Sequence, residues 1–330
     1  MTEDQLVASI RAVIEESYPK RARVAGVVGE TDDAALWQPS RSHRSAISTD
    51  MLVEGVDFTR AAMSLEDAGW RAMAANVSDL CAMGARPVLA TVALGFPEST
   101  TEDEVVELYR GLASCAFACK IAIVGGDLSR AGSITIAITV VGEVRPSNAK
   151  MRSGARPGDV LAVTGPLGAA HAGLELTRDA AAIADDLSLE GLAAFRRPQP
   201  RIAEGRFLAA SRNVTAMMDL SDGLSTDVDR LAAASGCGAE IESVPVADSA
   251  RGVAQALGVN PQRFALAGGE DFELLLAVRA RAFAHLALRY HRRFGRELFR
   301  VGRVQTGSGV RFNGASLERS GWDHFAPRSS

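Results

Sequence analysis

Apolar residues recur at helical spacing near the N-terminus of the chain. Leu6, Ile10, Val13 and Ile14 fall on one side of residues 4–16. Residues with this spacing return to the same face of a helix, so the pattern predicts an amphipathic helix.

Two further helices are predicted from their first turns. Ser64 and Thr101 are each followed, three residues later, by an acidic residue. This spacing forms a capping box, in which side chains satisfy the free N–H groups of the first turn. The predicted helices run to about Met83 and to about Cys119.

Short apolar and β-branched runs predict strands between and after these helices. In the first half of the chain they cover residues 34–37, 45–49, 87–95, 121–124 and 134–144. In the second half they cover residues 160–164, 215–218, 239–241, 272–278, 299–304 and 310–312. We expect the run 45–49 to end at Asp50, and the run 121–124 to be broken by Gly125, Gly126 and Asp127. Further helices are expected after Gly168, after Pro200, from Leu224 and over residues 283–294.

The composition of the sequence changes between residues 145 and 159, where two prolines and two glycines lie among scattered charged residues. Such a stretch predicts a domain boundary. We therefore expect an N-terminal domain of residues 1–145 and a C-terminal domain of residues 146–330. Strands and helices alternate in both parts, so the expected fold class is α/β with mixed sheets.

The composition is that of an ordinary globular protein, with 47% hydrophobic and 23% charged residues in a chain of 330. The net charge of −4 gives no general attraction to nucleic acid. No apolar run approaches the roughly 20 residues that span a membrane. The N-terminus lacks a signal-peptide pattern, and the four cysteines lack C-x-x-C spacing. These features predict a cytoplasmic protein with reduced thiols.

Three carboxylates lie within nine residues at the point where a predicted strand passes into a helix: Asp219, Asp222 and Asp227. Gly223 permits a sharp turn between the two elements. Crowded carboxylates repel one another, and a cation with oxygen ligands would compensate. Helix capping is the alternative, because Asp and Ser favour the first turn of a helix. We favour a metal site for Asp219 and Asp222, because similar groups recur along the chain.

Glycine and acidic residues occur together in residues 29–33, 125–127 and 268–271, and acids also lie at 49–50 and 76–79. Glycine lets backbone N–H groups approach phosphate oxygens, and carboxylates hold Mg²⁺ that bridges those oxygens. The repeated pattern indicates an enzyme that acts on Mg²⁺-bound polyphosphate. The sequence lacks a P-loop, a dinucleotide fingerprint and the protein-kinase motifs. Its five histidines lack zinc-like spacing.

The motifs resemble, in order and nearly from end to end, those of the thiamine-monophosphate kinases in the aminoimidazole-ribonucleotide synthetase superfamily. They are DDAA (32–35), STDMLVEGV (48–56), NVSDLCAMGA (76–85), GGD (125–127), RSGARPGD (152–159), MDLSDGLSTD (218–227), GGEDFEL (268–274) and GWDHF (321–325). The resemblance implies the two-domain architecture of that superfamily, in which the sheet of the N-terminal domain forms a homodimer. It also implies ATP-dependent phosphorylation of thiamine monophosphate to thiamine diphosphate, by direct transfer and without a phosphoenzyme.

The resemblance also assigns roles to residues. Several Mg²⁺ ions would be bound by Asp33, Ser48, Thr49, Asp50, Asp79, Asp127, Asp219 and Asp222. ATP would contact Tyr109, Gly125, Gly126, Arg152 and Ser221, and thiamine monophosphate would contact Asp57, Glu270 and Trp322. Two of these have alternatives: Tyr109 could pack its helix, and Trp322 could anchor the core. The stretch MDLSDGLSTD (218–227) would then be the C-terminal contribution to a shared cluster, with Asp227 a solvated or supporting residue one helical turn on.

The sequence departs from the family pattern at two positions. Thr31 stands where the family's G-x-G-D-D has its second glycine, and Asp57 stands where V-H-F has its histidine. An Asp at that place would repel a bare phosphate, although it could accept a hydrogen bond from an aminopyrimidine or bind another metal. Two alternatives therefore stay open: a paralogue that acts on another small phosphorylated substrate, and a non-catalytic module that binds ATP and Mg²⁺.

Overall fold

The computed structural model describes residues 2–17, 27–28, 34–178, 185–318 and 320–321. The chain forms two compact units. Unit 1 contains residues 1–149 and 196–202, and unit 2 contains residues 150–195 and 203–330. Within the described residues, no helix has both the length and the apolar character needed to cross a membrane.

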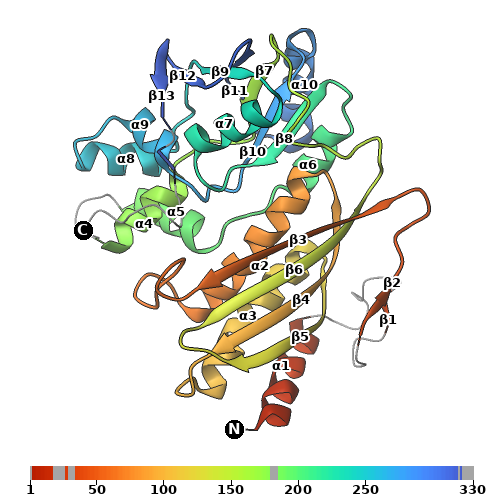
Figure 1. Ribbon diagram of the computed structural model, residues 1–330. Coiled ribbons are helices and arrows are strands. Elements are labelled where there is room, and N and C mark those ends of the chain that lie inside the picture. The colour runs from red at the N-terminus through yellow and green to blue at the C-terminus, as the bar shows by residue number, and fades with distance from the viewer. Residues whose placement is uncertain (1, 18–26, 29–33, 179–184, 319, 322–330) are drawn as a thin grey trace. The chain divides into compact units, whose positions relative to one another are not determined.

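Unit 1 is built on a four-stranded sheet with the order β3-β6-β4-β5 (Figure 1). Its strands are β3 (Arg44–Val53), β4 (Arg86–Phe96), β5 (Ala122–Arg130) and β6 (Thr135–Val144). β6 pairs antiparallel with both β3 and β4, whereas β4 and β5 are parallel. Parallel strands need a long crossover, which helix α3 (Glu102–Cys119) provides. A separate pair, β1 (Val27–Val28) and β2 (Leu36–Trp37), lies nearby in sequence.

Three helices complete unit 1: α1 (Glu3–Ser17), α2 (Leu65–Ala82) and α3. The prediction of all three is confirmed. Thr101 forms the full capping box with Glu104. Ser64 caps α2 by accepting a hydrogen bond from the N–H of Asp67, but the Asp67 carboxylate pairs with Arg197 instead of closing the box.

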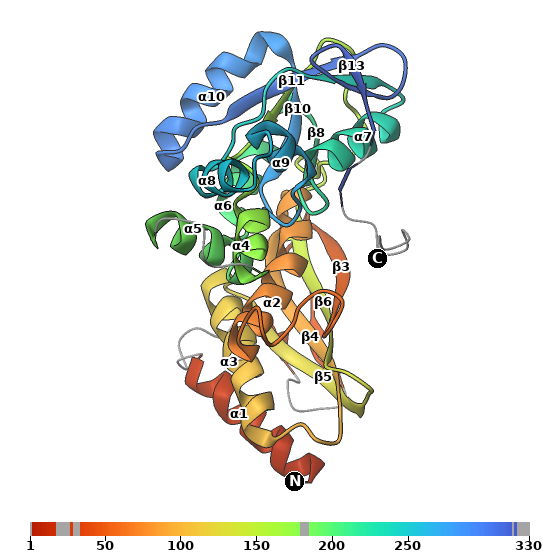
Figure 2. The ribbon, with the colours of Figure 1, turned by 90° about the vertical axis from the view of Figure 1, so that its left-hand side faces the viewer.

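Helices α2 and α3 pack together on one side of the sheet, as Figure 2 shows. Their backbones touch through a pair of glycines. A Cβ atom on Gly69 would lie 2.1 Å from the carbonyl oxygen of Leu108, and one on Gly111 would lie 1.8 Å from that of Glu66. No larger residue fits at either position, so glycine sets the closeness of the two helices.

The two faces of this sheet differ in cover. Ile136, Ile138 and Val140 of β6 are buried on the face that carries the helices. The opposite face, here called the open face, carries Ile47, Thr49 and Met51 of β3, Ala137 and Thr139 of β6, Thr91 and Ala93 of β4, and Asp127 of β5. Ile47 is 69% exposed and Met51 is 58% exposed. Toward one end of the sheet, Trp37 and Val141 pack against a cluster of Val88, Leu89, Ala122 and Val124.

Two of the predicted strand ends in unit 1 are wrong. β3 continues through Asp50 to Val53, and β5 continues through Gly125, Gly126 and Asp127 to Arg130. The expected break in β5 is a shift in pairing between Ala90 and Thr91 of β4, which leaves one extra residue in β5. A β-bulge of this kind absorbs an irregular residue without ending the strand.

Unit 2 contains a seven-stranded sheet with the order β13-β12-β9-β11-β7-β10-β8. The strands are β7 (Val160–Val163), β8 (Val214–Asp219), β9 (Gly238–Ile241), β10 (Leu274–Val278), β11 (Phe299–Gln305), β12 (Val310–Phe312) and β13 (Ala315–Leu317). Neighbours are antiparallel except β12 and β9, which are parallel. The mixed α/β fold class expected from the sequence is confirmed.

In the described part of this unit, the helices are α4 (Ala169–Arg178), α5 (Asp185–Arg196), α6 (Ile202–Ala209), α7 (Leu224–Ala234), α8 (Asp248–Ala256), α9 (Pro261–Ala267) and α10 (Ala280–Phe294). Figure 2 shows α7 and α10 on opposite sides of the sheet. Three of these helices, α5, α8 and α9, were not predicted from the sequence. α8 buries mainly small residues, such as Ala250 and Ala254, so its apolar stripe is weak. α9 begins with an Asn260 cap and Pro261, which is a recognisable start signal.

Candidate functional site

Four polar residues meet in unit 1 between strand β3 and helix α2. The Ser48 hydroxyl donates a hydrogen bond to the Asp79 carboxylate. The Asp50 N–H donates to the side-chain oxygen of Asn76 at 2.9 Å. Alternate residues of a strand share a face, and residues three apart on a helix are neighbours, so 48 with 50 and 76 with 79 can converge. Three of the predicted metal ligands therefore lie together on the helix-covered face.

Asn76 anchors this cluster, although no separate role was predicted for it. It is fully buried, and its side-chain N–H donates to the Ala72 carbonyl oxygen at 2.9 Å. Its oxygen is thereby aimed at Asp50. The signal for this role was its spacing of three residues before Asp79 in one helical motif.

Thr49 and Asp127, two other predicted ligands, lie on the open face instead. The Thr49 hydroxyl donates to the Ile138 carbonyl oxygen at 2.9 Å. Asp127 is on β5, the strand at the edge of the sheet opposite β3, and it pairs in register with Ala93 of β4. Three strand spacings separate β5 from β3, or about 14 Å. Unit 1 by itself therefore does not bring Asp127 to Asp50 and Asp79.

The two glycines beside Asp127 differ in their surroundings. A Cβ atom on Gly126 would lie 1.9 Å from the carbonyl oxygen of Val92, whereas one on Gly125 would have no neighbour within 4 Å. Gly126 is thus required by packing within the sheet. Gly125 leaves open space above an exposed stretch of backbone, where a ligand could approach.

Tyr109 and Asp57 both have local structural roles. Tyr109 is only 4% exposed, and burial raises the pKa of its phenol above the usual range, so the packing alternative accounts for its ring within unit 1. The Asp57 carboxylate accepts a hydrogen bond from the Val53 N–H at 2.8 Å. The Asp57 N–H in turn donates to the Val53 carbonyl oxygen. Asp57 therefore closes the turn that follows β3.

In unit 2, the predicted strand-to-helix switch is formed by β8, a short loop and α7. Asp219 ends β8 and is 4% exposed. Gly223 adopts a φ of 102°, and a Cβ atom there would lie 3.0 Å from the Ala267 carbonyl oxygen. Both facts require glycine at the turn.

Asp227 lies behind this loop, and of its two expected roles, solvated or supporting, the structure bears out the supporting one. The residue is fully buried, and its carboxylate accepts hydrogen bonds from the N–H groups of Ser221 (3.2 Å) and Asp222 (3.1 Å). Burial, together with the nearby charge of Asp222, raises the pKa of Asp227 to about 6. Asp227 therefore supports the loop that presents Ser221 and Asp222.

Arg230 is a functional residue that the sequence analysis missed. Its guanidinium contacts the carboxylate of Asp222 and, at 3.1 Å, that of Asp227. The crowded carboxylates do have a positive partner, and Arg230 supplies part of the compensating charge that was expected from a metal ion. Its spacing of three residues after Asp227 on a predicted helix could have revealed it.

The loop before β10 pairs with the loop after β8. The N–H of Glu270 donates to the Ser221 carbonyl oxygen at 2.7 Å, and that of Phe272 donates to the Leu220 carbonyl oxygen at 3.0 Å. The structure thus brings the predicted residues Ser221 and Glu270 together. Glu270 (φ 66°) and Phe272 (φ 47°) both adopt left-handed backbone conformations. Such strain persists only where surrounding contacts enforce it, and it is common at functional sites.

Asp271, between these strained residues, supplies the enforcing contacts. Its carboxylate accepts hydrogen bonds from the N–H groups of Gly168 (2.7 Å) and Ala170 (3.2 Å) at the start of α4. Burial raises the pKa of Asp271 to about 7. Asp271 therefore ties the Glu270 loop to the N-terminus of α4.

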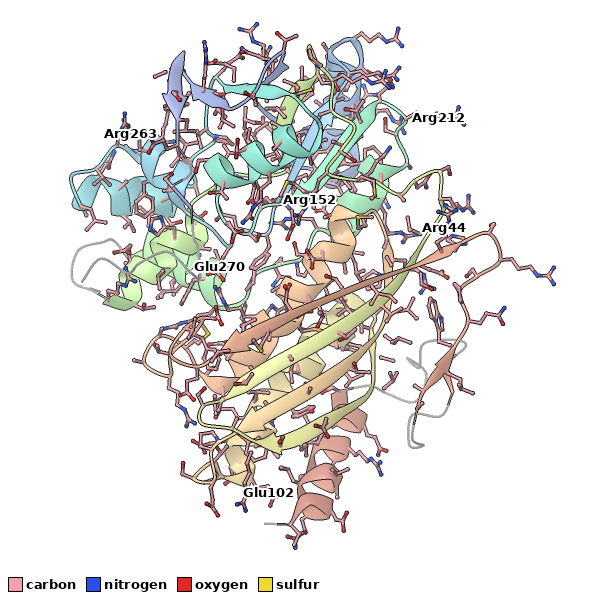
Figure 3. The ribbon with its side chains drawn as sticks, in the orientation of Figure 1. Arg44, Glu102, Arg152, Arg212, Arg263 and Glu270 are labelled. Carbon is pink, nitrogen blue, oxygen red and sulfur yellow. The ribbon has the colours of Figure 1, made fainter. Side chains whose placement is uncertain are left out.

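Arg152 lies in the segment that runs beside β8. The Met151 carbonyl oxygen accepts from the Met217 N–H at 3.1 Å, and the Arg152 carbonyl oxygen accepts from the Ser235 hydroxyl at 3.2 Å. The Arg152 side chain is exposed; Figure 3 labels Arg152 and Glu270. It can therefore offer its guanidinium to a ligand.

The described residues contain no group of three or more His, Cys, Asp or Glu side chains that could hold a metal ion. Each unit instead offers a small set of oxygen ligands: Asp50 and Asp79 beside Ser48 in unit 1, and Asp219 and Asp222 in unit 2. Mg²⁺ is usually bound through one or two carboxylates together with waters and substrate phosphates. The donor sets fit that ion when a phosphate ligand is present. Asp33 and Trp322, also predicted site residues, lie outside the described residues.

Comparison with known proteins follows this division of the chain. Residues 31–144 match the family "AIR synthase related protein, N-terminal domain", and residues 156–314 match the corresponding C-terminal domain. The thiamine-monophosphate kinase of Rhodopirellula baltica is 37% identical over 304 residues, which are 88% of each chain. The chain belongs to the thiamine-monophosphate kinase family.

Solved structures agree with this membership. The thiamine-monophosphate kinase of Stenotrophomonas maltophilia has a TM-score of 0.82 and 33% identity, and the match covers 96% of this chain and 98% of that one. The structure named AaThiL complexed with AMPPCP and TMP has a TM-score of 0.77 and 30% identity, with 98% and 97% covered. The resemblance inferred from the ordered motifs is therefore confirmed.

Proposed function

We propose that this protein transfers the γ-phosphate of ATP directly to thiamine monophosphate and so produces thiamine diphosphate. The observation that carries the proposal is the family membership along nearly the whole chain, including a relative whose structure holds AMPPCP and TMP. The two sets of carboxylates and the Gly-containing stretches support polyphosphate chemistry. Phosphoryl transfer requires alignment and charge neutralisation more than covalent catalysis.

Several Mg²⁺ ions fit the donor sets of both units. Asp50, Asp79 and Ser48 would hold metal in unit 1, and Asp219 and Asp222 would do so in unit 2. When bound, Mg²⁺ neutralises the phosphate oxygens whose mutual repulsion opposes the approach of the two substrates. The protein's own part is to hold the metal-binding carboxylates in place. Asn76 accepts a hydrogen bond from the Asp50 N–H, Asp227 accepts one from the Asp222 N–H, and Arg230 pairs with the Asp222 carboxylate.

The remaining predicted residues would position the two substrates. Arg152 supplies a fixed cation for the triphosphate of ATP, and the exposed backbone at Gly125 leaves room for phosphate oxygens. Ser221 belongs to the same supported loop as Asp222. Glu270 would contact thiamine monophosphate, held beside Ser221 by its backbone hydrogen bond.

The position of Asp57 supports this substrate against a paralogue with another one. Its carboxylate is engaged in the turn after β3 through the Val53 N–H. The departure from the family's histidine therefore has a local structural use and does not require a different substrate.

A direct assay tests the proposal. Purified protein with ATP, excess Mg²⁺ and thiamine monophosphate should yield thiamine diphosphate and ADP in equal amounts. Calorimetric binding of ATP with Mg²⁺ but no product would identify a non-catalytic module. Turnover of another phosphorylated acceptor, but not of thiamine monophosphate, would identify a paralogue.

We further infer that the protein is a homodimer whose subunits share metal ligands. The open face of the unit 1 sheet exposes Ile47 and Met51, and apolar surface of this kind favours a partner. Asp127 lies on this open face, on the opposite side and at the opposite edge of the sheet from Asp50. β3, which carries Asp50, is an edge strand of the sheet. A second copy seated on the open face could therefore bring its own Asp127 to this edge, where one metal could contact both carboxylates.

Subunit complementation tests this arrangement. Asp50→Asn and Asp127→Asn should each abolish turnover alone. A mixed dimer, purified through two different tags, should recover about half the wild-type activity, because one of its two sites would contain both intact carboxylates. If Asp127 served its own chain, both sites of the mixed dimer would be defective and no activity would return.

A further inference from the structure

Unit 2 has a cleft between helix α10 and the loop that precedes β8. Its volume is about 390 Å³, and its walls include Ser211, Asn213, Arg281, His285, Leu286 and Arg289. β8 separates this loop from Asp219, and six residues of extended strand span about 17–20 Å. The cleft is therefore at the other end of β8 from the loop of Ser221 and Asp222.

One wall of the cleft is cationic. Arg281, His285 and Arg289 are exposed and follow one another at four-residue intervals, which places them on the same face of α10. No acidic residue occurs in α10, and none lines the cleft. Within the described residues, no ion pair involves any of these three side chains. The Arg289 guanidinium is braced over the Phe207 ring, 5.4 Å from its centroid.

The opposite wall is rigid and adds hydrogen-bond donors. The ammonium of Lys150, which is only 8% exposed, donates to the carbonyl oxygens of Ser211 (3.0 Å) and Val214 (2.9 Å). The Ser211 hydroxyl oxygen accepts from the Asn213 N–H at 3.3 Å, so its own hydrogen can point into the cleft. The Asn213 carbonyl oxygen accepts from the Arg279 N–H at 3.0 Å. The loop is thus fixed at both ends, with a buried positive charge beneath it.

We propose that this cleft binds a small molecule carrying phosphate groups, at a site separate from that of the proposed phosphoryl transfer. Guanidinium groups and hydroxyl donors are the usual ligands of phosphate oxygens. The cationic wall from Arg281 to Arg289 covers eight residues of helix, or about 12 Å. That length exceeds a single phosphate and fits a diphosphate group with a small organic body. In a protein with a net charge of −4, such an uncompensated cluster of positive charge calls for an anionic partner.

Calorimetric titration with inorganic pyrophosphate, in EDTA and without Mg²⁺, tests the proposal. We expect one binding event in the wild-type protein. The double variant Arg281→Ala/Arg289→Ala should lose at least about tenfold in affinity, because charge-assisted hydrogen bonds are the strong ones. The matched control is Arg292→Ala/Arg293→Ala, which removes the same charge from the same helix but does not alter the lining of the cleft. It should stay within about twofold of wild type.

Three outcomes would overturn the proposal. An equal loss in both double variants would show that diffuse attraction to α10, rather than the cleft, binds the anion. Unchanged affinity in Arg281→Ala/Arg289→Ala would place the anion elsewhere, for example at the exposed Arg152. Absence of any binding to the wild type would exclude the site altogether. Thermal unfolding of each variant verifies that it remains folded, and none of these outcomes depends on kinase activity.

Discussion

Asp271→Asn should make the stability of the protein much less sensitive to pH. Burial raises the pKa of the Asp271 carboxyl from 3.8 to about 7 in the folded protein. The folded state therefore holds a proton that the unfolded chain releases between pH 4 and 7. Stability from this group is fully present below pH 4 and is lost as the pH rises through 7. About three pKa units, at 1.36 kcal/mol each, give a loss of about 4 kcal/mol.

Urea unfolding followed by circular dichroism, at pH 5 and at pH 8, measures this effect. The wild type should lose about 2–3 kcal/mol of unfolding free energy between the two values as Asp271 ionises. Asp271→Asn cannot ionise and should lose much less over the same range. It should be less stable than wild type at pH 5, since one amide oxygen replaces two carboxyl oxygens that accept from Gly168 and Ala170.

The matched control is Asp248→Asn, at the exposed start of α8, and it should keep the wild-type pH dependence. An equally steep pH dependence in Asp271→Asn would refute the reasoning, because the group responsible would then lie elsewhere.

The other predictions concern the site. Asp222→Asn should lower turnover at limiting Mg²⁺ by at least about 100-fold while the thermal midpoint changes by only a few degrees; unimpaired turnover in a steady-state assay would remove Asp222 from the metal ligands. Asp57→His restores the family residue, and thiamine diphosphate formation should stay within about threefold of wild type; a switch of acceptor would instead show that Asp57 selects the substrate. Gly126→Ala should destabilise the protein in urea by about 3 kcal/mol or more, because its Cβ would lie 1.9 Å from the Val92 carbonyl oxygen. Gly125→Ala, with no neighbour within 4 Å, should unfold like wild type, and equal destabilisation by both would contradict the packing argument.

Local signals in the sequence predicted the helices of unit 1 well. The hydrogen bonds that Ser64 and Thr101 accept act within a single turn, and only the closing of the Ser64 box depends on a distant residue, Arg197. The same holds for Gly223, where a sharp turn was expected at the strand-to-helix switch and the backbone has a φ of 102°.

Features that depend on distant parts of the chain could not be predicted. β5 passes through its two glycines because β4 pairs with it around a bulge, and the sequence of β5 does not contain that information. The face on which Asp127 lies follows from the strand order and the register of pairing, which no motif records. The sequence left open whether Asp227 is solvated or supporting, because its burial depends on the loop that folds over it. Arg230, in contrast, could have been found from its spacing.

The glycine contacts between α2 and α3 also bear on mutational tolerance. Because Gly69 and Gly111 place backbone against backbone, the separation of these helices does not depend on the size of any side chain between them. Hydrophobic residues elsewhere in unit 1 can therefore change during evolution without altering the distance between α3 and α2, the helix that carries Asn76 and Asp79. The two glycines themselves cannot be replaced without forcing the helices apart, and activity should be lost with the fold although neither glycine belongs to the proposed substrate site. Among random variants selected for activity, we expect substitutions at many neighbouring core positions and none at Gly69 or Gly111.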